Sequence, residues 1–200
     1  MPTNKFRVFR IRNDANGGYR SGIEEISLAD LSPGEIIIKA AYSSVNYKDA
    51  LAGTGQGKIL RQFPLNGGID VAGTVIESSD PNFKPDDEVL CTGCGLSETR
   101  DGGYSEYARL ESKWTVKLPI GLSLRESMIL GTAGFTAALA LYRMLQNSQS
   151  PELGPIAITG ATGGVGMLAT DIFTRAGFEV HALSGKPQHS DFLKSIGASK

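Results

Sequence analysis

The apolar positions along the chain change their spacing near residue 120. Before it they form short runs rich in β-branched residues, separated by turns that contain Gly, Pro and Asp, which is the pattern of a β domain. Four runs are predicted to be strands: 35–40, 71–77, 88–91 and 114–118. After Pro119 the apolar residues recur at helical spacing over 124–145, which predicts two packed helices. We therefore predict a mostly antiparallel β domain over 1–122 and an α/β domain over 123–200.

The end of the sequence alternates between strands and helices. An apolar run at 156–159 passes through glycines into a helical pattern that starts at Met167. A second strand over 179–183 and a second helix over 190–196 follow, with Gly197 after the helix. This order is that of half of a doubly wound sheet. Because the sequence stops where a third strand is expected, we expect these 200 residues to be the N-terminal part of a longer enzyme.

The turn between the first strand and the first helix is rich in glycine and is predicted to bind a pyrophosphate. Where a strand enters a helix through glycines, unpaired backbone N–H groups and the positive end of the helix dipole point to one spot. The turn departs from G-x-G-x-x-G by placing Ala161 where the first Gly belongs, and an ordinary turn is the alternative. The residues predicted to contact the cofactor here are Gly160, Thr162, Gly163, Gly164 and Val165.

The end of the second strand indicates which dinucleotide binds. An NAD site has Asp or Glu there to accept hydrogen bonds from the ribose 2′-hydroxyl, whereas an NADP site has cations and hydroxyl donors. The strand ends in Ser184-Gly185-Lys186, so that Lys186 can pair with a 2′-phosphate while Ser184 donates a hydrogen bond. Lys200 is a second candidate for the same phosphate, and a solvated surface charge is the alternative for both lysines. The predicted cofactor is NADPH.

Composition and charge narrow the function classes. The 20 Lys and Arg side chains nearly balance 21 Asp and Glu side chains, for a net charge of −1, which favours neither nucleic acid nor an anionic membrane as a partner. We expect no secretory signal, because no basic segment with an apolar core opens the sequence. The longest uncharged stretch, 128–142, is too short to span a bilayer, which predicts a buried helix. Two cysteines do not make a disulfide framework, which fits the cytoplasm.

Five motifs follow one another in the sequence. They are Asn46-Tyr47-Lys48-Asp49, the segment 63–73, the segment 102–108, the segment 131–136 and the glycine turn. The series resembles the medium-chain dehydrogenase/reductase superfamily over essentially the whole chain, in its zinc-independent quinone oxidoreductase branch, and within it the quinone oxidoreductase and acrylyl-CoA reductase subgroup. The resemblance implies an α/β protein with an N-terminal GroES-like, mostly antiparallel β-barrel and a doubly wound Rossmann domain about half present. It also implies a homodimer.

The positions that hold zinc in the alcohol dehydrogenases of this superfamily carry other residues. The resemblance places Asn46 at a Cys ligand, Ile69-Asp70 at a His-Glu pair, and Ala133 near a second Cys. Without thiolate or imidazole groups at these points a tetrahedral catalytic zinc has no ligands, so no metal is predicted. Cys91 and Cys94 lack the second pair of ligands that a structural zinc site needs, so we expect two ordinary residues in a strand-to-loop turn.

Without a metal, the predicted reaction is one that hydride delivery and hydrogen bonding can carry out: reduction of a quinone, an enone or acryloyl-CoA by NADPH. A carbon conjugated to a carbonyl accepts the hydride, and donors stabilise the negative charge on the carbonyl oxygen. The resemblance implies that Tyr47 lies beside nicotinamide and substrate, where it donates to that oxygen or only walls the pocket. Asn46 and Asp49 complete the predicted catalytic group, Asn46 as an amide donor and Asp49 as a residue that holds the loop, and Thr132 is predicted to contact the cofactor. The alternative is a sensor or structural relative that binds NADPH without significant turnover.

Overall fold

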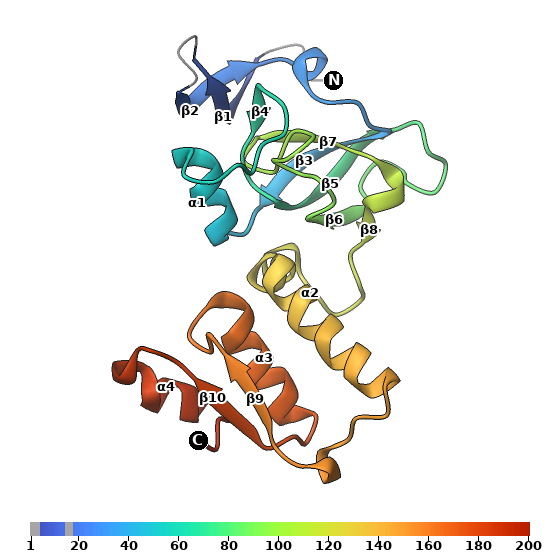
Figure 1. The fold of residues 1–200 in the computed structure, drawn as a ribbon. Coiled ribbons are helices and arrows are strands. Elements are labelled where there is room, and N and C mark those ends of the chain that lie inside the picture. The colour runs from blue at the N-terminus through green and yellow to red at the C-terminus, as the bar shows by residue number, and fades with distance from the viewer. Residues whose placement is uncertain (1–4, 15–17) are drawn as a thin grey trace. The chain divides into compact units, whose positions relative to one another are not determined.

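The computed structural model describes residues 5–14 and 18–200, and the chain divides into two compact units, Met1–Thr132 and Ala133–Lys200 (Figure 1). The division lies inside the helix α2 (Leu124–Gln146), later in the chain than the predicted boundary at residue 122. The first unit consists mainly of β-strands, and the second contains helices and a parallel pair of strands.

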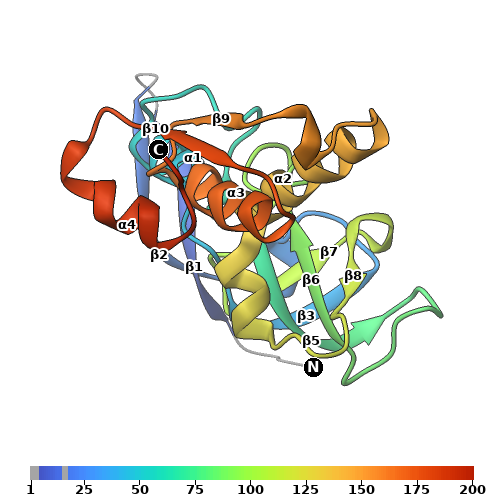
Figure 2. The same cartoon turned by 90° about the horizontal axis from the view of Figure 1, so that it is seen from below.

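A five-stranded antiparallel sheet forms the centre of the first unit, with the order β7-β3-β5-β6-β8 (Figure 2). Its strands are β3 (Ile36–Tyr42), β5 (Asp70–Ser78), β6 (Glu88–Thr92), β7 (Tyr107–Leu110) and β8 (Val116–Lys117). Ile36 and Ile38 of β3 are buried against Val71 and Val75 of β5 and Val89 of β6. Removing these branched side chains from water stabilises the sheet, and its antiparallel pairing confirms the predicted β domain.

A second sheet of the same unit has the order β2-β1-β4. Its strands are β1 (Phe6–Asn13), β2 (Tyr19–Ile26) and β4 (Leu65–Asn66). In β1 the side chains alternate, with Phe6 and Val8 buried and Arg7 exposed between them. These strands and β7 are not predicted by the sequence pattern, because arginines interrupt the apolar residues of β1 and because β2 is mostly polar.

A short helix, α1 (Tyr47–Thr54), follows β3 and was also absent from the predicted elements. Asn46 has extended backbone angles and is its N-cap, and the carboxylate of Asp49 accepts a hydrogen bond from the backbone N–H of Asn46 at 2.8 Å. The helix ends at Gly55, whose φ of 69° is in the left-handed region that favours glycine. Two 3-10 turns complete the unit, η1 (Leu28–Asp30) and η2 (Ser112–Trp114).

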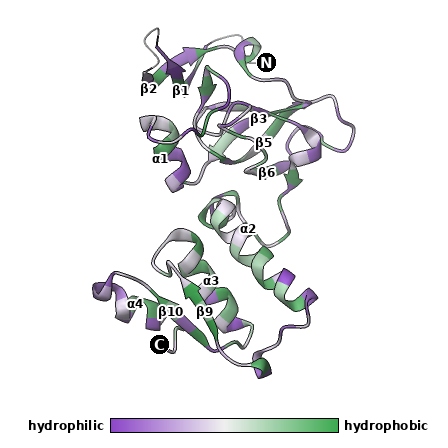
Figure 3. Cartoon of the chain, in the orientation of Figure 1, coloured by the Kyte–Doolittle hydropathy of each residue, from purple (hydrophilic) through white to green (hydrophobic). Residues whose placement is uncertain are grey.

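α2 is interrupted at Gly131, whose φ of 49° and ψ of −154° are non-helical, so the two predicted helices are present as two segments joined by a kink. The prediction that residues 128–142 are buried is wrong. Only 22% of the most apolar window of this 23-residue helix is buried, and apolar residues follow its length (Figure 3). Its length and composition alone would allow α2 to cross a membrane, but core helices pass the same test, so this is weak evidence. The exposed apolar side chains of α2 are Ile129, Leu130, Phe135, Leu139, Tyr142 and Leu145.

The second unit contains the predicted strand–helix–strand–helix order. β9 (Ile156–Thr159) and β10 (Val180–Leu183) pair in parallel, with Val180 opposite Ile156. The helix α3 (Gly164–Arg175) connects the two strands, and α4 (Ser190–Ser195) follows β10. Phe173 and Phe178 pack edge to face near the buried Val180. The arrangement confirms the partial Rossmann domain, and its 3-10 turns are η3 (Pro151–Leu153) and η4 (Pro187–His189).

Candidate functional site

Asp49 fixes the start of α1. It is 6% exposed, and its two carboxylate oxygens accept hydrogen bonds from the backbone N–H groups of Asn46, at 2.8 Å, and of Ile69, at 2.9 Å. These bonds tie the N-terminus of α1 to the segment that leads into β5. Because both oxygens are engaged by backbone donors, the geometry gives Asp49 a role in holding the loop.

Asn46 and Thr132, which are far apart in the sequence, meet at the side chain of Asp70. The Asn46 amide nitrogen donates to one oxygen of Asp70 at 2.8 Å, and the Thr132 hydroxyl donates to the other at 2.6 Å. The backbone N–H of Thr132 also donates to Asp70, at 3.1 Å. Asp70 is fully buried. In the sequence Asp70 stands out only as a position where the zinc enzymes carry another residue, and no pattern there predicts a role for it in the site.

Tyr47 is the first residue of α1, and 81% of it is exposed. Its neighbour Asn46 is held by Asp49 and Asp70, so the backbone that carries Tyr47 is fixed while its ring is open to solvent. The Tyr47 hydroxyl can therefore contact a bound molecule, and no hydrogen bond that the structure records for it has to break first.

Tyr104, from the predicted motif at 102–108, supports the segment between β3 and α1. Its hydroxyl donates to the backbone carbonyl of Ser44 at 3.0 Å, and the Ser44 hydroxyl donates to the carbonyl of Met128 at 2.7 Å. Burial, and secondly the charge of Asp49, raise the pKa of Tyr104 above its ordinary value. Tyr104 therefore keeps its proton and acts as a donor, a support that the sequence analysis did not predict.

The glycine turn between β9 and α3 requires glycine at two positions, at Gly160 for its backbone angle and at Gly166 for lack of space. Gly160 has a φ of 62°, and its carbonyl accepts a hydrogen bond from the backbone N–H of Gly163 at 2.8 Å. A Cβ at Gly166 would lie 2.3 Å from the Gly160 carbonyl oxygen. Ala161 is fully buried, and its methyl group packs in a cluster with Leu193 and Ala198. Thr162, Gly163, Gly164 and Val165 thus form the tight entry to α3, with the first unpaired N–H groups of the helix.

Replacing Gly166 with Ala is expected to lower the free energy of unfolding by about 1–3 kcal/mol, because the added Cβ meets backbone atoms that can only give way if the turn moves. Gly164→Ala is the control for stability, since its Cβ would make only an ordinary contact at 3.6 Å. Urea unfolding of the two variants measures the difference. Equal stability of Gly166→Ala and Gly164→Ala would contradict this account of the turn.

A cleft of about 600 Å³ lies where β9 and β10 end. It is lined by Thr159, Gly160, Thr162, Leu183, Ser184, Gly185 and Lys186. The hydroxyl groups of Thr162 and Ser184 are 3.1 Å apart, and the backbone N–H of Lys186 donates to Ser184 Oγ at 3.1 Å. Of the predicted cofactor contacts, the cleft brings Gly160 and Thr162 together with 184–186 at the strand end, whereas 163–165, at the entry to α3, do not line it.

Three lysines surround an adjoining smaller cleft of about 200 Å³: Lys186, Lys194 and Lys200. Lys200 is held there because its carbonyl accepts a hydrogen bond from the backbone N–H of Ala182 at 2.7 Å. Glu179 lies at the opposite end of β10 and contacts His181 at 2.8 Å, and that contact is the main cause of the lowered pKa of Glu179. A glycine turn at a helix N-terminus fits the pyrophosphate of a dinucleotide. Hydroxyl groups and lysines nearby fit a further phosphate on the same molecule.

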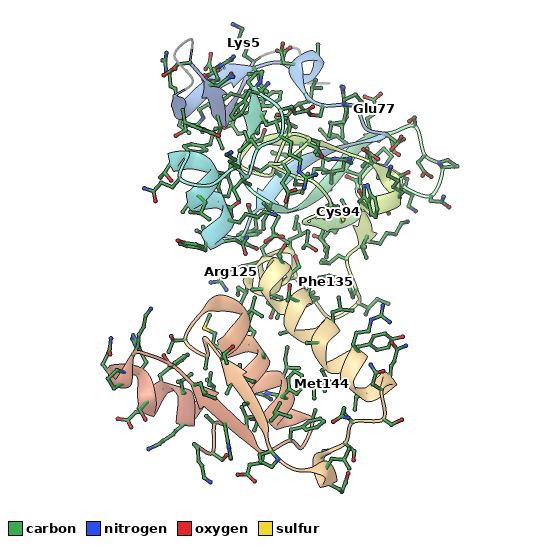
Figure 4. All side chains as sticks on the ribbon, viewed as in Figure 1. Lys5, Glu77, Cys94, Arg125, Phe135 and Met144 are labelled. Atoms are coloured by element: carbon green, nitrogen blue, oxygen red, sulfur yellow. The ribbon has the colours of Figure 1, made fainter. Side chains whose placement is uncertain are left out.

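Among residues 5–14 and 18–200, no group of three or more His, Cys, Asp or Glu side chains is placed to hold a metal ion. Cys91 is buried in β6, whereas Cys94 is exposed in the loop that follows (Figure 4). Burial, and secondly the neighbouring Cys94, raise the pKa of the Cys91 thiol to about 12. The two cysteines thus stand in the strand-to-loop turn that the sequence predicts.

The two thiols should therefore differ in reactivity. A thiol reagent is expected to modify Cys94 quickly and Cys91 only on unfolding, because thiolate and access are both needed. Since the folded pKa of Cys91 is raised, its contribution to stability is complete below about pH 9 and declines as pH rises toward 12. Cys94→Ser should remove the fast phase of the reaction. A fast phase that survives this change would contradict the assignment.

Residues 32–120 match the family model described as the alcohol dehydrogenase GroES-like domain. Residues 32–120 thus form an alcohol dehydrogenase GroES-like domain. The GroES-like domain contains the five-stranded sheet, α1, and the side chains of Asn46, Asp49 and Asp70.

Curated relatives match the chain over a longer stretch that extends into the second unit. The chain is 50% identical over 178 residues to quinone oxidoreductase YhfP of Bacillus subtilis, which covers 89% of this chain and 54% of YhfP. It is 43% identical to acrylyl-CoA reductase AcuI of Ruegeria pomeroyi, over 94% of this chain and 57% of AcuI. The chain therefore spans little more than half the length of these relatives. They confirm the predicted resemblance to quinone oxidoreductases and acrylyl-CoA reductases.

Solved structures with the same fold contain nicotinamide cofactors. The yhdH oxidoreductase of Salmonella enterica in complex with NADP matches with a TM-score of 0.92 and 43% identity, over 96% of this chain and 59% of that one. The structure of Bacillus subtilis yhfP with NAD bound matches with a TM-score of 0.94 and 46% identity, over 98% and 60%. The GroES-like domain and the partial Rossmann unit thus share the fold of solved oxidoreductases that hold NADP or NAD.

Proposed function

We propose that the protein is an NADPH-dependent oxidoreductase that reduces an activated C=C bond or a quinone without a metal ion. The observation that carries the proposal is the cleft at the ends of β9 and β10, where the glycine turn adjoins Ser184 and Lys186. The names of YhfP and AcuI supply the two substrate classes, quinones and acryloyl-CoA. An enone is the simplest compound with the same conjugated group.

The choice of NADPH over NADH rests on charge. Lys186, Lys194 and Lys200 line one small cleft. Glu179 is not among the lining residues and its first hydrogen-bond partner is His181, although the Lys200 charge also helps to lower the pKa of Glu179. Lysines attract a 2′-phosphate, whereas a carboxylate at the strand end would favour a free 2′-hydroxyl. One solved relative holds NADP and another holds NAD, so the residues of this chain, and not the fold, support NADPH.

A reduced nicotinamide, when bound, supplies the hydride. The residues of this chain then have to bind the electrophile and stabilise the charge that develops on its carbonyl oxygen. Asn46 has a second amide N–H besides the one given to Asp70, and Tyr47 has an exposed phenol, so both can donate to such an oxygen. Asp49 accepts two backbone hydrogen bonds and holds the loop that carries them.

Loss of the near-ultraviolet absorbance of NADPH tests the proposal when acryloyl-CoA or a small quinone is added to the intact protein. Oxidation of NADPH with either compound is the expected result. Tight binding of NADPH without oxidation by either compound would favour the alternative, an NADPH-binding sensor or structural relative.

We also propose that the protein is a homodimer and that it lies in the cytoplasm. Ultracentrifugation of the intact protein can check the first point, and cell fractionation can check the second.

A further inference from the structure

Asp70 is a buried carboxylate whose three recorded donors are neutral and come from other elements. The amide of Asn46 precedes α1, and the hydroxyl and backbone N–H of Thr132 follow the kink of α2. Burying an ionised carboxylate costs free energy unless hydrogen bonds replace water. Three donors at 2.8, 2.6 and 3.1 Å supply that replacement.

The backbone around Asp70 leaves room for this carboxylate. A Cβ at Gly131 would lie 2.9 Å from an Asp70 oxygen and 2.3 Å from the hydroxyl oxygen of Ser44. Gly131 also has a φ of 49° and a ψ of −154°, which residues with a Cβ rarely adopt. The kink of α2 at Gly131 therefore brings the backbone N–H of Thr132 to Asp70. Glycine is the residue type that permits this, because a Cβ at this position would displace the carboxylate.

A carboxylate fixes the direction of its partners because it only accepts hydrogen bonds. Asn46 must turn its amide nitrogen toward Asp70, which directs its side-chain oxygen to the backbone N–H of Asp49 in the capping box of α1 and leaves its other N–H for further contacts. Thr132 must give its hydroxyl proton to Asp70, so toward any further group its hydroxyl can only accept. An amide in place of Asp70 both donates and accepts, and would allow either partner to turn.

We propose that Asp70 is the positioning residue of this oxidoreductase, a buried carboxylate that holds the amide of Asn46 and the hydroxyl of Thr132 in one orientation. The inference rests on the proposed function. It assigns Asn46 as the donor to the developing oxyanion of the substrate. It assigns Thr132 as an acceptor, which suits the carboxamide N–H group of a nicotinamide.

Asp70→Asn tests the proposal with almost no change in volume. We expect kcat to fall about 10- to 100-fold with a smaller change in the KM of the electrophile, because orientation and not substrate binding is lost. Asp101→Asn is the matched control. Asp101 is also buried, at 4% exposure, but its partners are Arg10, Ser32 and Asn66, so this variant should be less stable and keep its kcat.

A second pair of variants covers the case in which Asp70→Asn does not fold. Thr132→Val removes the hydroxyl donor at constant shape, and Thr132→Ser retains it. Thr132→Val should lower kcat several-fold, and Thr132→Ser should recover most of that loss. Equal losses in the two variants would contradict the role of the hydroxyl bond.

A spectroscopic measurement tests the orientation without cofactor or turnover. In a ¹⁵N–¹H spectrum the two side-chain amide protons of Asn46, assigned by their loss in Asn46→Asp, should be well separated and protected from exchange with water. Asp70→Asn should bring the two signals together and speed their exchange, while Asp101→Asn leaves them unchanged. Thr132→Val should leave the Asn46 signals separated, because the hydroxyl bonds to the other oxygen of Asp70.

The outcomes separate this inference from the proposed function. Unchanged Asn46 signals in Asp70→Asn would overturn the inference, whatever the activity. Changed signals with a kcat within twofold of the wild type would also overturn it, because the orientation would then have no effect on the reaction. If the wild type fails to oxidise NADPH with each of the electrophiles tested, the proposed function fails. The spectra alone then decide whether Asp70 orients Asn46.

Discussion

NADPH binding is expected to weaken by about 100- to 1000-fold when Lys186 is changed to Glu and Ser184 to Ala together, whereas NADH binding should weaken by less than about tenfold. The reason is that the change removes a cation and a hydroxyl from the cleft at the end of β10 and adds a carboxylate. A charged hydrogen bond to phosphate is about twice as strong as a neutral one, and like charges at short range repel. The 2′-hydroxyl of NADH carries no charge and gains a carboxylate acceptor.

Titration calorimetry of both dinucleotides against the variant measures this selectivity. Lys84→Glu, in the first unit, is the control for the change in net charge and should leave both affinities unchanged. Equal weakening of NADPH and NADH would show that the end of β10 does not contact the 2′-position. The measurement should be repeated at two salt concentrations, because an exposed charge pair is screened by salt.

The second large effect concerns stability. Asp101→Ala is expected to lower the free energy of unfolding by about 3–5 kcal/mol, because it leaves the charge of Arg10 buried without its partner. The two side chains are 6% and 4% exposed and are 2.5 Å apart. Asp101 also accepts hydrogen bonds from the backbone and hydroxyl of Ser32 and from the backbone of Asn66, so the change leaves several buried donors unpaired.

Urea unfolding of Asp101→Ala measures this loss, and Asp171→Ala is the matched control. Asp171 pairs with Arg175 at 2.8 Å on the surface of α3, where the side chains are 38% and 78% exposed. Such a pair contributes at most about 1 kcal/mol. A loss for Asp101→Ala no larger than for Asp171→Ala would show that the buried pair does not stabilise the first unit.

The second unit could be predicted from the sequence because its signals are local. Gly160 and Gly163 form a turn within four residues, and the alternation of strand and helix on either side follows the chain. The end of β10 follows from the same pattern, so Ser184 and Lys186 were expected beside the glycine turn and lie there. Ala161 departs from the usual glycine pattern, and a methyl group fits there because it packs with Leu193 and Ala198.

The buried carboxylate could not be predicted, because its partners are not local. Asp70 is 24 residues from Asn46 and 62 residues from Thr132, and no periodicity connects the three. The prediction that residues 128–142 of α2 form a buried helix was wrong for a related reason. Apolar spacing shows which side chains favour burial, but not which element covers them, and Phe135 is 58% exposed. In the same way β1 and β2 depend on pairing with each other, which their polar residues conceal.

The transfer of deuterium from labelled NADPH tests the central claim most directly. The intact protein is mixed with acryloyl-CoA or a small quinone and with NADPH that carries deuterium at both C4 positions of the nicotinamide. Mass spectrometry then follows the product and the oxidised cofactor. The account predicts loss of one deuterium from the cofactor, and its appearance on carbon when acryloyl-CoA is reduced. Labelled NADPH that binds tightly and is recovered unchanged with both compounds would contradict it.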